Sequence, residues 1–296
     1  MKFLQNFRKK MKIGIIGLGK MGQNHLKELS KNPKFTINAL FDLNQNLNSH
    51  APFFQNLDEF LAQNNDCVII ATPTNTHLEL AKKLFGQVKT LLIEKPLAIN
   101  LKEIEEIQKL AISYQNNIAI GFCERFNPAV LTLKQELKNE KIISINIQRY
   151  SPYPTRILDI GVLQDLAVHD LDLLYFLSKQ RITKAEILKK STQNKHRESE
   201  SILACECENF IACVHQSWNS SQKLRKIHLI TQNHFFEADL NEFSLKKDGK
   251  ELQMISLNSP LFSEHNALFD LALSQQNDLA CIEDAYAVQE LLERCE

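Results

Sequence analysis

The feature that most constrains this chain is a glycine-rich turn near its N-terminus. Gly17, Gly19 and Gly22 form the pattern GxGxxG between an apolar run at residues 12–18 and a helical pattern at residues 20–31. In such a strand–turn–helix, the first glycine permits the tight turn, the second lets the backbone approach a pyrophosphate, and the third lets the helix pack on the strand. The helix N-terminus then offers N–H donors to phosphates. The turn, with Lys20 and Met21, therefore predicts dinucleotide binding, and a purely structural turn is the alternative.

Strand and helix patterns alternate through the first part of the chain. Apolar runs typical of buried parallel strands occupy residues 12–18, 35–41, 67–72, 90–95 and 117–122. Helical patterns fill the intervals at residues 20–31, 57–63, 77–85 and 101–114. This alternation predicts an α/β domain with a doubly wound parallel sheet of the Rossmann type over residues 1–122, in which residues 1–10 are a basic leader.

The pattern changes after residue 122. Helical patterns occur at residues 129–138, 162–178, 266–275 and 283–294. Strand-like runs cover residues 141–150, 183–189, 201–207, 210–218, 225–231 and 234–240, with a hairpin around residues 247–250. Consecutive strands joined by short turns indicate an antiparallel or mixed sheet. We expect residues 123–296 to form an α+β domain on an open, mostly antiparallel sheet.

Composition narrows the classes of partner. Lysine plus arginine and aspartate plus glutamate both number 35 in 296 residues, so the basic excess of a nucleic-acid binder is missing. There is no apolar run long enough for a transmembrane helix. The basic start resembles a secretory signal, but the apolar stretch that follows is short, and Met11 is an alternative start. The seven cysteines have no paired spacing, which favours reduced thiols and a cytoplasmic location.

A single carboxylate indicates which dinucleotide is bound. Asp42 follows the second predicted strand, twenty positions after Gly22. A carboxylate there can accept both ribose hydroxyls of NAD and would repel the 2′-phosphate of NADP. Because no arginine follows closely, NAD is the expected cofactor, and an aspartate that merely begins a turn is the alternative.

Polar residues also follow the third and fourth predicted strands, where ligands bind in open α/β sheets. The third strand leads into the segment ATPTNTH, which supplies Thr72, Pro73, Asn75 and His77 as cofactor-binding candidates. The fourth leads into Glu94, Lys95 and Pro96. We expect Lys95 to project towards the ligand, with an ordinary surface lysine as the alternative.

One helix of the second domain carries a possible acid–base pair. Asp165, His169 and Asp172 recur at spacings of four and three residues, which places them on one helical face. Histidine suits general base chemistry near neutral pH, and a neighbouring aspartate can orient it or hold a hydroxyl. A metal site is the weaker interpretation because no further ligand has suitable spacing. A solvated helix face is the structural alternative.

These motifs, together with ERFNP at residues 124–128, occur in the order found in one family. The chain resembles the glucose–fructose oxidoreductase / inositol dehydrogenase (Gfo/Idh/MocA) family over about residues 11–177, and more loosely beyond. The resemblance implies hydride transfer between a nicotinamide and a sugar or cyclitol carbon, with Lys95, Asp165 and His169 as catalytic residues. It also implies a cis Lys95–Pro96 peptide and a homo-oligomer formed through the second sheet. Where many members have consecutive glycines before the Asp/His helix, this chain has Asp159-Ile160-Gly161, which predicts a stiffer loop.

A narrower resemblance concerns the substrate. ERFNP, the loop RYSPYPTR at residues 149–156 and the run DIGVLQDLAVHD resemble a subgroup that oxidises C3 of UDP-N-acetylglucosamine. Arg125, Arg149 and Arg156 are the candidate ligands for the diphosphate of such a substrate. The alternative is that they form salt bridges at the domain junction. Other functions remain open: a family enzyme acting on a free sugar, inositol, imine or enone, or a non-catalytic NAD-sensing regulator. Oligomer size and reaction direction are not predicted.

Overall fold

The computed structural model describes residues 10–44, 51–154, 160–192 and 197–294. The chain divides into two compact units. The first takes in the chain up to Ala98, together with Glu105–Gly121 and Leu261–Leu279, and the second contains Ile99–Ile104, Phe122–Pro260 and the chain from Ala280 onward. The break after Gly121 lies one residue before the expected boundary. The segment Leu261–Leu279, which we expected in the second domain, instead packs within the first unit.

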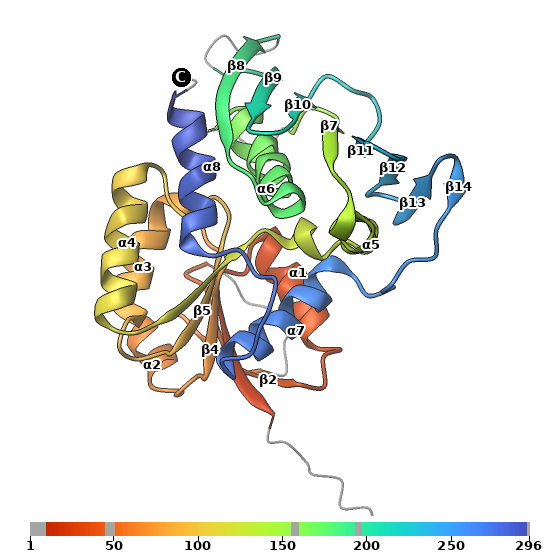
Figure 1. The fold of residues 1–296 in the computed structure, drawn as a ribbon. Helices are drawn as coiled ribbons and strands as arrows, with labels where there is room; N and C mark the ends of the chain where they lie inside the picture. The colour runs from red at the N-terminus through yellow and green to blue at the C-terminus, as the bar shows by residue number, and fades with distance from the viewer. Residues whose placement is uncertain (1–9, 45–50, 155–159, 193–196, 295–296) are drawn as a thin grey trace, which may run out of the picture. The chain divides into compact units, whose positions relative to one another are not determined.

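The first unit is built on a six-stranded parallel sheet with the order β3-β2-β1-β4-β5-β6 (Figure 1). Its strands are β1 (Met11–Ile16), β2 (Phe35–Phe41), β3 (Phe53–Phe54), β4 (Cys67–Ile70), β5 (Thr90–Glu94) and β6 (Asn117–Gly121). Every residue of β4 and β5 is buried, as expected for strands covered on both faces. The predicted Rossmann-type sheet is therefore confirmed, and β3 is an addition too short to show a periodic pattern.

Helices follow these strands as the alternating pattern predicted. They are α1 (Lys20–Leu29), α2 (Leu57–Leu61), α3 (His77–Leu84), preceded by the 3₁₀ turn η1 (Thr74–Thr76), and α4 (Leu101–Ser113). The later helix α7 (Pro260–Ala272) adds Leu268 and Phe269 to the core of this unit. The Phe269 ring meets Phe35 edge-on, with centroids 5.7 Å apart. Burial of these apolar side chains explains why α7 returns to the first unit.

The second unit holds an eight-stranded sheet with the order β14-β13-β12-β11-β7-β10-β9-β8. Its strands are β7 (Ile142–Tyr150), β8 (Ile182–Lys190), β9 (Glu200–Cys207), β10 (Ile211–Ser217), β11 (Leu224–Thr231), β12 (Phe235–Asp239), β13 (Ser244–Lys247) and β14 (Lys250–Glu251). All neighbours pair antiparallel except β7 and β10, which run parallel. The expected mostly antiparallel sheet is thus confirmed.

Helices of the second unit include one with an irregular start. They are η2 (Cys123–Phe126), α5 (Pro128–Glu136), η3 (Leu137–Asn139), the π-helical turn η4 (Leu163–Ala167), α6 (Val168–Ser178) and α8 (Ile282–Arg294). The segment η4–α6 occupies the predicted helix at residues 162–178, but its first turn is wider than an α-helix. Val162 packs on the buried Trp218, which anchors the start of this helix to the loop after β10.

Two further observations bear on the class of protein. No helix in the described ranges has the length and apolarity needed to cross a bilayer. The six cysteines in those ranges, Cys67, Cys123, Cys205, Cys207, Cys213 and Cys281, are free thiols.

Candidate active site

The glycine turn between β1 and α1 leaves no room for larger side chains at two positions. Gly17 has φ +89°, and a Cβ there would lie 2.7 Å from the carbonyl oxygen of Ala71. A Cβ on Gly22 would collide with the carbonyl oxygen of Gly17. Both glycines are therefore required by the turn itself and by the packing of α1 on it.

Gly19 differs from these two because internal packing does not require it. It precedes α1 as the N-cap residue and is exposed. Apart from its chain neighbours, no atom of the described residues lies within 4 Å of the place a Cβ would occupy. Lys20 is also exposed and Met21 is half-buried. A helix N-terminus that is open and lacks a covering side chain suits a dinucleotide pyrophosphate. The turn therefore fits the phosphates of the expected cofactor.

Asp42 is tied to this turn by a hydrogen bond. Its Oδ2 accepts from the backbone N–H of Leu18 at 2.7 Å, and its Oδ1 accepts from Asn44 N–H at 2.9 Å. Each carboxylate oxygen can accept a further donor. The structure thus places Asp42 beside Gly17 and Gly19 with acceptor capacity to spare, which fits the ribose hydroxyls of NAD.

The segment after β4 contains both accessible and buried candidates. Pro73 and Asn75 are exposed. Within the same segment, the Thr76 hydroxyl donates a hydrogen bond to Thr72 Oγ1 at 2.7 Å. His77, in contrast, is buried, with Nε2 lying 3.0 Å from the carbonyl oxygen of Thr72.

The other ring nitrogen of His77 reaches the neighbouring loop. Its Nδ1 lies 3.1 Å from the carbonyl oxygen of Pro96 and 3.2 Å from that of Leu97. Burial lowers the pKa of His77, although the carbonyl contacts oppose this effect. The ring of His77 thus lies between the loops after β4 and β5, where one of its nitrogens can donate to a backbone carbonyl, and its role in cofactor binding stays a prediction.

The loop after β5 carries Lys95. The Lys95–Pro96 peptide is cis, as the resemblance implied. Lys95 is half-buried, whereas Glu94 is buried. The carboxylate of Glu94 accepts from the backbone N–H of Lys95 through Oε2 at 3.2 Å and lies 2.8 Å from His25 Nε2 through Oε1. The Glu94 carboxylate is therefore turned towards buried partners, and the prediction that residue 94 contributes to cofactor binding remains untested.

The helix η4–α6 carries the two other catalytic candidates. Asp165 lies within the π-helical turn and His169 is the second residue of α6, and both are half-buried. Single π-helical turns occur frequently at functional sites. The His169 ring meets Phe122 edge-on, with centroids 6.2 Å apart. The two candidates thus share one irregular helical segment.

Glu198 caps the start of this segment. Its Oε1 accepts from the backbone N–H of Leu163 at 3.1 Å, and its carbonyl oxygen accepts from Val162 N–H at 3.0 Å. A Cβ on Gly161 would collide with the Glu198 carboxylate. The single glycine left in this loop is therefore the one that makes room for the capping carboxylate.

The guanidinium group of Arg125 forms ion pairs within the second unit. Its Nε donates to Asp172 Oδ2 at 2.8 Å and its Nη2 to Asp172 Oδ1 at 2.6 Å, while Nη2 also lies 3.0 Å from Asp284 Oδ2. The arginine is buried, and Asp172 is buried with it. Arg125 therefore joins η2, α6 and α8, and Asp172 anchors α6 through it. These ion pairs are the salt bridges that the sequence offered as the alternative, and the role of Arg125 as a diphosphate ligand stays a prediction.

Arg149 has a similar structural role. Its Nε donates to Asp170 Oδ1 at 2.7 Å and its Nη1 to Glu124 Oε1 at 3.1 Å. Arg225 adds a second donor to Glu124 at 2.7 Å. Burial acts to raise the pKa of Glu124, but the two arginines outweigh it and hold that pKa below its ordinary value. Arg149 is therefore held in internal ion pairs, and its role as a diphosphate ligand stays a prediction. Arg156 lies outside the described residues.

Sequence reasoning missed the partners of these groups. His25, His265, Glu124 and Asp170 gave no signal, because each pairs with a residue that no local spacing connects to it. Glu124 and Asp170 could have been suspected only from their place inside the motifs ERFNP and HDLD.

A comparison with known families identifies the first unit. Residues 11–122 match the family model GFO_IDH_MocA, described as "Oxidoreductase family, NAD-binding Rossmann fold". These residues are therefore similar to an oxidoreductase family. The matched range runs from β1 to the residue after β6 and contains the glycine turn, Asp42 and Lys95.

Comparisons over longer stretches find relatives of the same kind. UDP-N-acetylglucosamine 3-dehydrogenase of Acidithiobacillus ferrooxidans is 30% identical over 174 residues, which cover 57% of this chain and 54% of that protein. Glucose-6-phosphate 3-dehydrogenase of Bacillus subtilis is 29% identical over 214 residues, covering 65% and 61%. The chain thus spans little more than half the length of these curated relatives.

A solved structure extends the similarity to the second unit. The crystal structure of the Acidithiobacillus ferrooxidans enzyme matches 97% of this chain and 96% of its own, with a TM-score of 0.88 and 21% identity. The two chains therefore share their fold over both units.

Proposed function

We propose that this chain is an NAD-dependent dehydrogenase that oxidises a hydroxyl group of a sugar to a ketone. The observation that carries the proposal is the hydrogen bond between Asp42 and Leu18, because it holds an acceptor for ribose hydroxyls at an open glycine turn. The similarity of residues 11–122 to an NAD-binding oxidoreductase family supports it.

The chemistry rests on three residues that the family resemblance names. His169 acts as the general base that removes the hydroxyl proton. Lys95 donates a hydrogen bond to the same oxygen and stabilises the negative charge that develops there. Asp165 orients His169 or holds a neighbouring hydroxyl. NAD, when bound, supplies the acceptor for the hydride that leaves the same carbon.

For the substrate, we propose C3 of a UDP-N-acetylhexosamine. The similarity to UDP-N-acetylglucosamine 3-dehydrogenase supports this choice. Because Arg125 and Arg149 are held in internal ion pairs, we favour Arg156 among the three predicted diphosphate ligands. The alternative substrate is a free sugar, an inositol or a sugar phosphate, as the similarity to glucose-6-phosphate 3-dehydrogenase suggests.

The test compares hydride donors at equal concentration. NADH formation is followed with UDP-N-acetylglucosamine, N-acetylglucosamine, glucose 6-phosphate and myo-inositol. We expect preference for the UDP sugar, and an increase in its KM in Arg156→Ala. A preference for any donor without a nucleotide would contradict the UDP-sugar proposal, and NAD binding without any turnover would favour the regulator.

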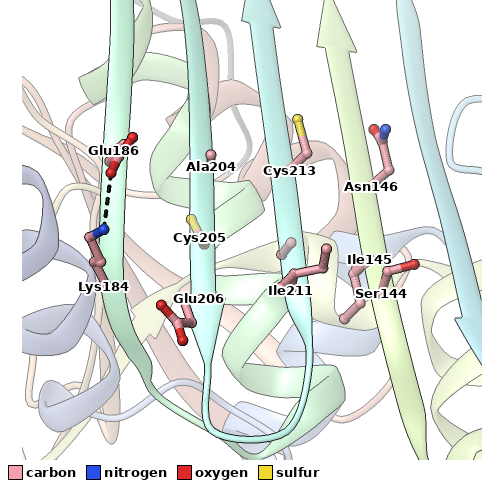
Figure 2. A pocket seen from close by; sticks show the side chains of 11 residues that line it. Ser144, Ile145, Asn146, Lys184, Glu186, Ala204, Cys205, Glu206, Ile211 and Cys213 are labelled. Atoms are coloured by element: carbon pink, nitrogen blue, oxygen red, sulfur yellow. Dashed lines mark ion pairs between the residues drawn. The ribbon is translucent and has the colours of Figure 1, made fainter.

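We also propose that the protein is a cytoplasmic homo-oligomer that assembles through the sheet of the second unit. The face of this sheet away from α6 exposes apolar side chains, among them Ile211, Ile230 and Leu188. An open hollow of about 520 Å³ lies on the sheet between β7, β8, β9 and β10, lined in part by Ser144, Asn146 and Cys213, with the Lys184–Glu186 ion pair at its β8 side (Figure 2). Light scattering during size-exclusion chromatography tests the proposal, and a mass of 34.1 kDa would contradict it.

A further inference from the structure

Three buried ionisable side chains of the first unit are joined in series by hydrogen bonds, and the series begins at Glu94, the residue before Lys95. His25 on α1 is fully buried, with Nε2 2.8 Å from Glu94 Oε1 and Nδ1 2.9 Å from His265 Nε2. His265 comes from α7 and is also fully buried. We call Glu94, His25 and His265 the Glu94 chain. It joins β5, α1 and α7, which are far apart in the sequence.

The backbone around Glu94 is shaped to hold its carboxylate. Glu94 pairs with Gly121 across β5 and β6. A Cβ on Gly121 would lie 2.9 Å from the carboxyl carbon of Glu94 and 3.0 and 3.1 Å from its oxygens. Any larger residue at position 121 would therefore displace the carboxylate from His25. The glycine at the end of β6 is part of the same arrangement.

The direction of the hydrogen bonds follows from the chemistry of the groups. An ionised carboxylate only accepts, so His25 Nε2 carries the proton donated to Glu94 Oε1. Burial and the neighbouring His25 ring lower the pKa of His265 well below 6.5, so His265 is neutral. Its Nδ1 has no hydrogen-bond partner within the described ranges, which favours the tautomer with the proton on Nε2. His265 then donates to His25, and His25 to Glu94.

A gain in folding stability does not by itself explain why the Glu94 chain is buried. Burying ionisable groups costs desolvation free energy, and apolar residues of similar volume are often equally stable or more stable in their place. The Glu94 chain instead fixes the orientation of a hydrogen-bond acceptor. Because His25 holds Oε1 of Glu94, Oε2 accepts from the backbone N–H of Lys95 at 3.2 Å.

We propose that His25 and His265 are positioning residues for Lys95, acting through the carboxylate of Glu94. This inference rests on the proposed function in assigning the catalytic role to Lys95. Neither histidine is accessible to substrate, so neither is a catalytic residue. His25 lies three positions after Gly22, so the helix that begins at the glycine turn also holds the backbone at Lys95. Misplacing a reacting group by about 1 Å can cost about 10²-fold in rate.

The decisive variants separate positioning from packing. His25→Leu removes both hydrogen bonds, whereas His25→Gln keeps an amide donor that can reach Glu94. Asn32→Ala is the matched control, because buried Asn32, in the turn after α1, also contacts α7, donating to Asn266 Oδ1 at 3.2 Å, and is not part of the Glu94 chain. We expect kcat of His25→Leu to fall about 10²-fold, with KM and the Kd for NADH within about threefold, and partial rescue in His25→Gln.

A second readout needs no substrate. Hydrogen–deuterium exchange of overlapping peptides that differ by Lys95 isolates the exchange of its amide, and Pro96 adds no N–H of its own. We expect exchange at Lys95 to become about tenfold faster in His25→Leu and to stay unchanged in Asn32→Ala. If His25→Leu fails to fold, His265→Leu takes its place, because it removes the hydrogen bond that orients the His25 ring towards Glu94.

The two readouts keep the inference separate from the proposed function. If the unmodified protein oxidises no sugar, the proposed function fails, and the exchange rate at Lys95 alone decides whether the Glu94 chain holds that backbone. Unchanged exchange in His25→Leu and His265→Leu, or a kcat loss equal to that of Asn32→Ala, would overturn the positioning role.

Discussion

One oxygen of the Asp42 carboxylate accepts the backbone N–H of Leu18 at 2.7 Å, so the end of β2 is fastened to the glycine turn. The bond has two consequences. It fixes the position of a negative charge beside Gly17 and Gly19, and it makes the shape of the turn depend on the residue at position 42.

Asp42→Ala removes both the charge and the support of the turn. We expect the Kd for NAD to rise by about 10–100-fold and the preference over NADP to shrink, as for loss of hydrogen bonds to a charged group. Asp42→Asn is the matched control, because its amide oxygen can still accept from Leu18 while the charge is gone. Fluorescence titration with NADH and NADPH measures both constants. Equal affinity of the unmodified protein for both cofactors would contradict the assignment.

Lys95→Ala and His169→Ala test the catalytic assignment. Removing a positioned acid–base group costs about 10²–10⁴ in rate. We expect losses of this size in kcat, with the Kd for NADH unchanged, because neither side chain belongs to the glycine turn. Lys27→Ala, an exposed lysine on α1, is the control. Near-full turnover in either variant on the true substrate would remove that residue from the mechanism.

Gly161→Ala tests the capping of the helix that carries Asp165 and His169. The new methyl group collides with the Glu198 carboxylate and separates it from Leu163 N–H. We expect the free energy of unfolding to fall by about 1 kcal/mol, as for loss of a helix cap, and kcat to fall with it.

The double variant Gly161→Ala/Glu198→Ala distinguishes collision from loss of the cap. Removing the carboxylate relieves the collision, so the double variant should be more stable than the sum of the two single changes predicts. Urea unfolding of all four proteins measures this coupling, and strict additivity would contradict the proposed contact.

Strands and turns whose conformation depends on neighbouring residues were predictable from the sequence. The buried strands of the first unit read as continuous apolar runs, and the strands of the second unit as alternating ones. The glycine turn was predictable for the same reason, since only glycine fits at Gly17 and Gly22. The π-helical turn was not, because the spacing of Asp165 and His169 suits both kinds of helix.

Contacts between residues far apart in the sequence could not be predicted from local patterns. Residues His25 and His265 meet although 240 positions separate them, and nothing near either one indicates the other. The sequence indicates the charges of Arg125 and Arg149 but does not indicate which carboxylates pair with them. Only the fold reveals that Asp172 and Asp170 neutralise them and that their side chains are buried.

The Arg125 ion pair should therefore matter for stability. Removing one member of a buried ion pair leaves the other charge uncompensated and costs about 3–5 kcal/mol. We expect this loss for Arg125→Ala in urea unfolding, while the surface-exposed pair of Arg294 and Glu290 contributes little when Arg294→Ala is made as the control. A loss below about 1 kcal/mol would contradict the structural role of Arg125.

The Glu94 chain predicts how stability depends on pH. Burial lowers the pKa of His265 well below the ordinary 6.5, so between these two values the unfolded chain binds more protons than the folded one. Stability must then rise with pH in this window and be lost as pH falls from about 6.5 towards the lower pKa, with a slope of at most about 1.4 kcal/mol per pH unit for one histidine.

His265→Asn removes this titration and should flatten the stability profile below pH 6.5, even where it lowers stability at neutral pH. Asn32→Ala removes another contact with α7, made from the turn after α1, without a titratable group, so its profile should stay parallel to that of the unmodified protein. Urea unfolding at a series of pH values from 5 to 8 measures the slopes. His77, whose pKa burial lowers, and Asp172, whose pKa burial raises to about 6, still titrate in this variant, so the expected result is a slope smaller than that of the unmodified protein. A profile of His265→Asn that runs parallel to the unmodified protein would contradict a neutral, buried His265 as the end of the Glu94 chain.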